Sequence, residues 1–247
     1  MVLSLTQPSL LGMLLLLLVS NVLQWENVSS APIQDNEVEN GAVSLKDLFN
    51  HAITLSRTTN NITMEMRKLF FSDDFSSKMF KKIVLGFLKD KKHMIKTLNS
   101  CHTFSLHTPE TVEEAGEMSL EEFLKIILSI VYAWDNPLHH LVTELRGMKG
   151  APDEILLKAQ GIETLNKELL KSIMTILRKV HPGIEGNKDY PVWNDLESLQ
   201  ADDEELHFFA LYKLFYCLRV DAYTVDLYLK YLMCVLVGGD ICSSVKF

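Results

Sequence analysis

The chain has 247 residues, of which 47% are hydrophobic and 23% are charged, and its formal net charge is −8. This length and apolar content are sufficient for one large domain with a substantial core. The negative charge argues against nucleic-acid binding through bulk electrostatics, so we expect no nucleic-acid partner.

The N-terminus has the pattern of a secretory signal peptide. An apolar stretch contains the leucine run Leu14–Leu18 and is too short to span a bilayer. We place cleavage after Ser30, which gives a signal peptide of residues 1–30 and a single mature domain of residues 31–247. No Lys or Arg precedes the apolar stretch, which leaves an uncleaved anchor as the alternative. We expect a secreted, extracellular protein with no membrane insertion in its mature form.

The first predicted helix begins near Leu45 and continues to about Leu69. Its apolar residues recur at steps of three and four, which is the spacing of one buried helix face. The middle of this stretch, residues 56–63, is polar and poor in helix-forming residues. Asn61 begins an Asn-Ile-Thr glycosylation signal, and we expect a glycan there.

A basic amphipathic helix is predicted next, between Lys78 and Lys96. This segment holds seven lysines and one acidic residue, Asp90, with apolar residues between them. One interpretation is a crossover helix whose apolar side packs on the rest of the protein while its lysines face solvent. The other is a site for heparin-like polysaccharide. The candidate polysaccharide-binding residues are Lys78, Lys81, Lys82, Lys89, Lys92 and Lys96.

The second long helix is expected to begin at Ser119, which forms a capping-box pattern with Glu122. Pro137 interrupts its apolar stripe, but the stripe resumes in phase, so we expect a kink and not an end. The third helix starts near Pro152, a favoured first-turn proline, and runs to Val180.

The fourth helix is expected from about Asp202 to about Val237, where two glycines follow. A turn of only a few residues joins helices two and three, which makes them antiparallel. The connections before helix two and before helix four are far longer than is usual inside a compact domain. Two long crossovers around a short middle turn are typical of one topology. The predicted fold is therefore all-α, an up-up-down-down four-helix bundle of the long-chain cytokine type with two long crossover loops.

Four cysteines are present, and in an oxidising compartment we expect them to be paired. Four cysteines allow three connectivities, and their spacing does not choose between them. The histidines show no metal-ligand spacing, and we expect no metal and no cofactor. No P-loop, G-x-S-x-G or H-E-x-x-H motif is present, so an enzyme is not expected.

Two cysteine-containing segments resemble the signatures of the prolactin and growth-hormone family. The first is C-H-T-F-S-L-H-T-P, Cys101–Pro109, followed at the expected distance by Trp134. The second is C-L-R-V-D-A-Y-T-V-D-L-Y-L-K-Y-L-M-C, Cys217–Cys234. Segments Asn136–Met148 and Tyr190–Trp193 are more similar to prolactin than to growth hormone. The leucine-rich opening resembles the placental prolactin-like proteins of rodents.

The resemblance implies a secreted, non-enzymatic ligand for a cell-surface class I cytokine-type receptor. It also implies that Cys101 pairs with Cys217 and that Cys234 pairs with Cys242. The short N-terminal loop of true prolactins is missing, because no cysteine lies between Ala31 and Ser100. The alternative function is an extracellular heparin- or matrix-binding factor that uses the basic 78–96 segment.

The resemblance further assigns receptor-binding positions. Four residues of helix four match the exposed basic set of prolactins: Tyr212, Arg219, Tyr228 and Lys230. Four others, Tyr216, Val220, Tyr223 and Thr224, replace His, Arg, His and Lys, and Arg57 and Asn60 replace two histidines of helix one. We expect weak or lost binding to the prolactin receptor, since charged hot-spot residues are missing. Ser172 keeps the small residue that a second receptor face requires on helix three.

Overall fold

The structure is a computed structural model that describes residues 43–183 and 189–245. Within these ranges every regular element is a helix. Four long segments form the body: α2 (Leu45–Ser72), α6 and α7 (Leu120–Ala133 and Asp135–Gly147), α8 (Asp153–Val180) and α10 (Glu204–Val237). The predicted signal peptide, residues 1–30, and the first residues of the predicted mature domain lie outside the described residues.

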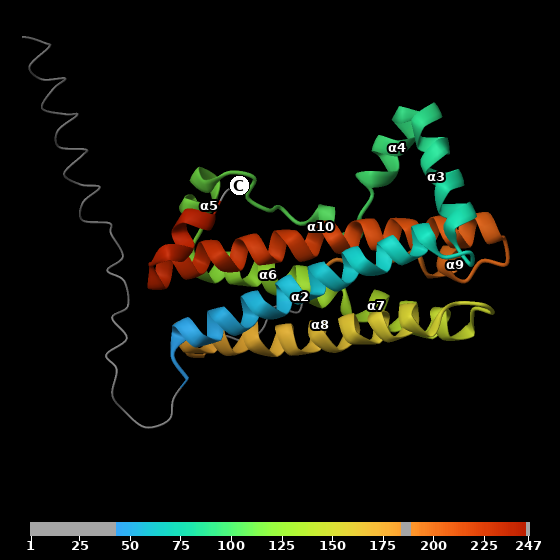
Figure 1. The fold of residues 1–247 in the computed structure, drawn as a ribbon. Helices are drawn as coiled ribbons and strands as arrows, with labels where there is room; N and C mark the ends of the chain where they lie inside the picture. The colour runs from blue at the N-terminus through green and yellow to red at the C-terminus, as the bar shows by residue number, and fades with distance from the viewer. Residues whose placement is uncertain (1–42, 184–188, 246–247) are drawn as a thin grey trace, which may run out of the picture.

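The long helices have the predicted up-up-down-down order. Helix α2 and the α6–α7 pair run in one direction, and α8 and α10 run in the other (Figure 1). Helix α2 packs on both α8 and α10, while α6 and α7 pack on α8. The turn between α7 and α8 is short, whereas the other two connections cross from one end of the bundle to the other (Figure 1). The predicted four-helix bundle with two long crossovers is therefore confirmed.

Short helices occupy the connections. The first crossover holds α3 (Ser77–Lys89), α4 (Lys91–Leu98), η1 (His102–Ser105) and α5 (Val112–Glu117). The second crossover holds α9 (Leu196–Leu199), and η2 (Asp240–Ser244) follows α10. Helices α3 and α4 form a hairpin that projects from the bundle beyond α10 (Figure 1).

The ends of the long helices are close to those predicted from sequence. The capping box at Ser119 is present, since its side chain bonds to the backbone N–H of Glu122 and the Glu122 carboxylate bonds back. Asp203 caps α10 by accepting from the backbone N–H of Leu206. Capping groups of this kind satisfy donors that have no partner inside the helix.

Helix α2 is continuous through its polar middle. Thr59 and Thr63 donate their hydroxyl groups to backbone carbonyls one turn earlier, at 3.0 Å and 2.8 Å. Both side chains are buried, so these bonds remove the cost of leaving a hydroxyl unpaired in the core.

The second long helix divides at Trp134, so the kink expected from Pro137 is a one-residue break between α6 and α7. Proline has no N–H, and the carbonyl of Ala133 therefore lacks its usual helical donor. His102, on the first crossover, places Nε2 3.1 Å from that carbonyl oxygen and donates the replacement hydrogen bond. Burial lowers the pKa of His102, which favours the neutral ring.

The lysine-rich segment is two helices, and the prediction of a single helix is wrong. The break is at Asp90, whose carboxylate accepts a hydrogen bond of 2.9 Å from the backbone N–H of His93 and so begins α4. The backbone N–H of Asp90 still bonds to the carbonyl of Gly86 and ends α3. The apolar spacing continues across this break, which is why periodicity alone predicted one helix.

An aromatic cluster joins α3 to the core. Phe80 of α3 is fully buried, and its ring stacks on Phe70 of α2 at a centroid distance of 4.9 Å. Phe70 also contacts Phe215 of α10 at 4.7 Å. Other large core residues are Phe49, Met66, Phe123, Leu128, Leu138 and Leu141. No described helix has both the length and the apolar character needed to cross a bilayer.

Candidate receptor-binding surfaces

Both disulfide bonds implied by the resemblance are present. Cys101 is bonded to Cys217, 116 positions away, which fastens the first crossover to the middle of α10. Cys234 is bonded to Cys242 and closes a small loop after α10. All four cysteines of the chain are therefore paired.

A buried acid beside the first disulfide was missed by the sequence reasoning. Asp221 of α10 accepts hydrogen bonds on one carboxylate oxygen from the hydroxyl of Thr103 (2.8 Å) and the indole N–H of Trp134 (2.7 Å). Burial raises the pKa of Asp221 to about 7, because the two hydrogen bonds offset only part of the desolvation cost. This network joins the first crossover, the break between α6 and α7, and α10 at one point.

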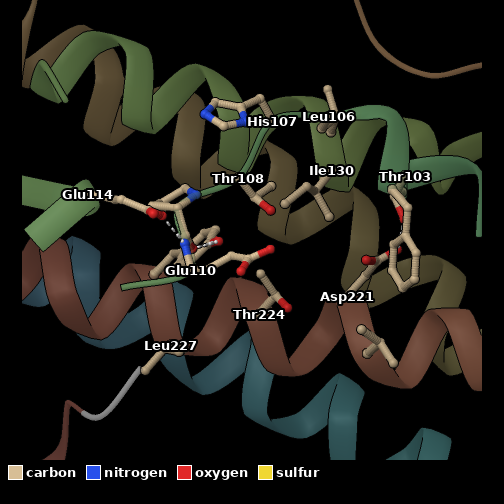
Figure 2. Close-up of a pocket in the computed structure, with 14 residues that line it drawn as sticks. Thr103, Leu106, His107, Thr108, Glu110, Glu114, Ile130, Asp221, Thr224 and Leu227 are labelled. Atoms are coloured by element: carbon tan, nitrogen blue, oxygen red, sulfur yellow. Dashed lines mark hydrogen bonds between the residues drawn. The ribbon is translucent and has the colours of Figure 1, made fainter. Parts of the chain in front are cut away.

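A groove of about 800 Å³ lies between the first crossover and α10 (Figure 2). The crossover contributes Thr103, Phe104 and residues 106–110, and α10 contributes Val220, Asp221, Thr224, Leu227 and Tyr228. The exposed charged side chains of this lining are both acidic: Glu110 and Glu114. A partner group that enters the groove would meet carboxylates and apolar carbons.

The outward face of α10 beside this groove is available to a partner. Arg219 is exposed, and Tyr223 is 57% exposed. Val220 and Thr224 are half-buried and line the groove. Arg219 and Tyr223 are four residues apart, as are Val220 and Thr224, so each pair lies on one side of the helix and the two pairs are adjacent.

Tyr212 is buried, and the expectation that it is an exposed receptor contact is corrected. Only 7% of the residue is accessible, because α3 lies over this part of α10. The rings of Phe80 and Phe87 are centred 5.5 Å and 5.6 Å from the Tyr212 ring. The first crossover therefore covers a position that the resemblance placed on the receptor face.

Tyr228 is also buried, at 3% exposed. Its hydroxyl donates a 2.8 Å hydrogen bond to the carbonyl of Pro109, and its ring contacts Phe123. The side chain fastens the first crossover to α10. It is a structural residue at this position, and the assignment as an exposed contact is corrected.

Lys230 and Ser172 are not openly exposed either. Lys230 is largely covered and forms an ion pair with Asp226, one turn earlier on α10. Ser172 is buried within α8. Of the five receptor-binding residues expected from sequence, Arg219 alone is exposed.

The helix-one positions lie on α2, which packs directly against α10. Arg57 is exposed, and Asn60 is half-buried. Asn61, the predicted glycosylation site, is exposed on the same helix. A glycan there would stand on the surface of α2.

The lysines of the α3–α4 hairpin are all exposed. On α3 the lysines at 78, 81, 82 and 89 share one face, because they are spaced by three, four and seven residues. Lys82 forms a surface ion pair with Glu205 of α10. Among the described residues no group of three His, Cys, Asp or Glu side chains is placed to hold a metal ion.

A sequence model of the somatotropin hormone family matches residues 17–242. The chain belongs to the somatotropin hormone family. It is thus a prolactin-family, hormone-like protein and not an enzyme. The two disulfides and the helical bundle described above are those expected of a somatotropin-family member.

Rodent prolactin-family proteins are similar to this somatotropin-family chain over nearly its whole length. Mouse prolactin-7C1 is 65% identical over 247 residues, which covers 100% of this chain and 98% of the relative. Rat prolactin-7B1 is 49% identical over 242 residues, with 98% and 96% covered. Mouse prolactin-7D1 is 48% identical over 241 residues, with 98% of each chain covered.

Proposed function

We propose that the mature protein is a secreted ligand for a cell-surface class I cytokine-type receptor. Hormones of this family are normally secreted, and the family implies a receptor of this type. The observation that carries the proposal is the exposed face of α10 around Arg219 and Tyr223, next to the groove. Cleavage after Ser30, a glycan on Asn61 and expression in the placenta belong to the same proposal and rest on the sequence pattern.

We infer that binding to the prolactin receptor is weak or lost. The resemblance requires basic and histidine side chains where this chain has Val220, Tyr223 and Thr224. Tyr212 is buried beneath α3. The charged residues that line the groove beside Val220 and Thr224 are acidic. Losing charged hot-spot contacts costs about 2 kcal/mol or more each.

Restoring those side chains is expected to recover lactogenic binding. The triple variant Val220→Arg, Tyr223→His, Thr224→Lys should bind the prolactin-receptor ectodomain about tenfold or more tightly than the parent chain. Surface plasmon resonance measures both affinities. The matched control, Leu157→Arg, Thr164→His, Thr175→Lys, places the same side chains at exposed positions of α8 and should bind like the parent. Sub-nanomolar binding by the parent chain would contradict the inference.

A second candidate function is binding to heparin-like polysaccharide, and it rests on the exposed lysines of the hairpin. Local basic charge, and not the net charge of −8, governs attraction to a dense polyanion. Replacing Lys78, Lys81, Lys89 and Lys92 with Ser leaves the Lys82–Glu205 ion pair intact. This variant is expected to lose retention on a heparin column at physiological salt.

The control for this experiment replaces four exposed lysines outside the hairpin: Lys46, Lys68, Lys149 and Lys171. It should elute with the parent chain. Two results would contradict polysaccharide binding: elution of the parent below physiological salt, or equal loss of retention in both variants. The lysines would then only face solvent on a crossover helix.

A further inference from the structure

Three large apolar side chains face solvent among the lysines of the α3–α4 hairpin. Leu85 and Leu88 of α3 are 57% and 68% exposed, and Ile95 of α4 is 55% exposed. Phe80 and Phe87, on the other side of α3, are buried against the bundle. Packing on the bundle therefore explains why Phe80 and Phe87 are apolar. It does not explain why Leu85, Leu88 and Ile95 are apolar.

The exposed apolar residues share a helix face with lysines. Residues three or four positions apart on a helix are surface neighbours, and Leu85 and Ile95 each have lysine neighbours of this kind. The result is the same on both helices: an apolar side chain with cationic side chains around it. The neighbours are Lys81, Lys82 and Lys89 for Leu85, and Lys91 and Lys92 for Ile95.

Between Lys78 and Lys96 there is one acid against seven lysines. Asp90, the one acid between Lys78 and Lys96, caps the start of α4. From the bundle, Glu205 of α10 pairs with Lys82. The hairpin also projects beyond α10, so its outer surface can meet an extended partner (Figure 1).

We propose that the α3–α4 hairpin binds peripherally to membranes rich in anionic phospholipid. The lysines lie against the phosphate and carboxylate head groups, and Leu85, Leu88 and Ile95 enter the interface between head groups and acyl chains. A sulfated polysaccharide would use the lysines but would leave the three apolar side chains in water. This interaction is separate from receptor binding by α10 and does not depend on it.

Co-sedimentation with vesicles tests the proposal. The purified full mature protein should bind vesicles of phosphatidylcholine with phosphatidylserine and should not bind vesicles of phosphatidylcholine alone. The variant Leu85→Ser, Leu88→Ser, Ile95→Ser should lose about tenfold or more of its partitioning onto the anionic vesicles. Its elution from heparin should be unchanged, because every lysine remains.

The matched control replaces three exposed apolar residues outside the hairpin, Val112, Leu157 and Val192, with Ser, and should bind vesicles like the parent. A separate variant, Leu88→Trp, reports on insertion without removing apolar surface. Its emission should shift to the blue on anionic vesicles and be quenched by lipids brominated in the acyl chain. Failure of the parent to bind anionic vesicles, unchanged binding by the Leu/Ile triple variant, or an unquenched Trp at position 88 would each overturn the proposal.

Discussion

Replacing Cys101 and Cys217 with Ser is expected to lower the free energy of unfolding by about 4 to 5 kcal/mol. The bond spans 116 positions, and a cross-link that closes a long loop removes more freedom from the unfolded chain than one that closes a short loop. It also lies beside the Thr103–Asp221–Trp134 network, so its loss releases the first crossover from α10 at the point where the groove forms. Urea unfolding of the purified protein, followed by circular dichroism, measures the change.

The second disulfide supplies the matched control. Cys234 and Cys242 are separated by only 8 positions, and the same chain-entropy argument gives a cost of about 2.5 kcal/mol for their replacement by Ser. Peptide mapping without reduction should first show both bonds in the secreted protein. An equal or smaller loss for the Cys101–Cys217 variant would contradict the assigned role of the long-range bond.

The contribution of Asp221 to stability is expected to fall as the pH rises from 5.5 to 8. The pKa of this buried carboxyl is about 7 in the folded protein against an ordinary value of 3.8, so the folded state binds the proton more tightly than the unfolded state. The stabilising contribution is therefore complete below about pH 4 and is lost as the pH passes through about 7. For this group alone, linkage gives a loss of about 2 kcal/mol between pH 5.5 and pH 8.

The variant Asp221→Asn isolates this contribution. Its amide oxygen can still accept from Thr103 and Trp134, but the side chain does not ionise, so the difference in unfolding free energy between variant and parent should change by about 2 kcal/mol over this range. Asp202→Asn, at an exposed position, should track the parent at every pH. A pH profile for Asp221→Asn that is parallel to that of the parent would show that Asp221 does not titrate in this range.

The four long helices could be predicted from sequence because each buries an apolar face with regular spacing and has recognisable ends. The capping box at Ser119 and the start near Pro152 are both found. Topology followed from the lengths of the connections. The breaks at Trp134 and Asp90 were harder to place, because they leave the apolar period unchanged. At each break a single side chain bonds to the backbone: His102 to the carbonyl of Ala133, and the Asp90 carboxylate to the N–H of His93.

The receptor face was predicted less well than the fold. The resemblance placed Tyr212 and Tyr228 on an exposed face, but the first crossover covers both. Phe80 and Phe87 pack on the ring of Tyr212. The carbonyl of Pro109 accepts a hydrogen bond from the hydroxyl of Tyr228. These are contacts between segments far apart in sequence, which helical spacing does not reveal. Asp221 did leave a signal: it lies in phase with Leu218 and Val225 of the buried stripe, where an acid must find partners.

Binding of the secreted protein to a panel of class I cytokine-receptor ectodomains tests the central claim most directly. The account predicts that at least one ectodomain binds the parent chain, and that Arg219→Ala with Tyr223→Ala weakens that binding about tenfold or more. The matched pair Arg178→Ala with Tyr190→Ala, at exposed positions outside α10, should bind like the parent. Absence of binding to every ectodomain, or binding that is unchanged by the Arg219 and Tyr223 substitutions, would contradict the assignment of this face as the receptor site.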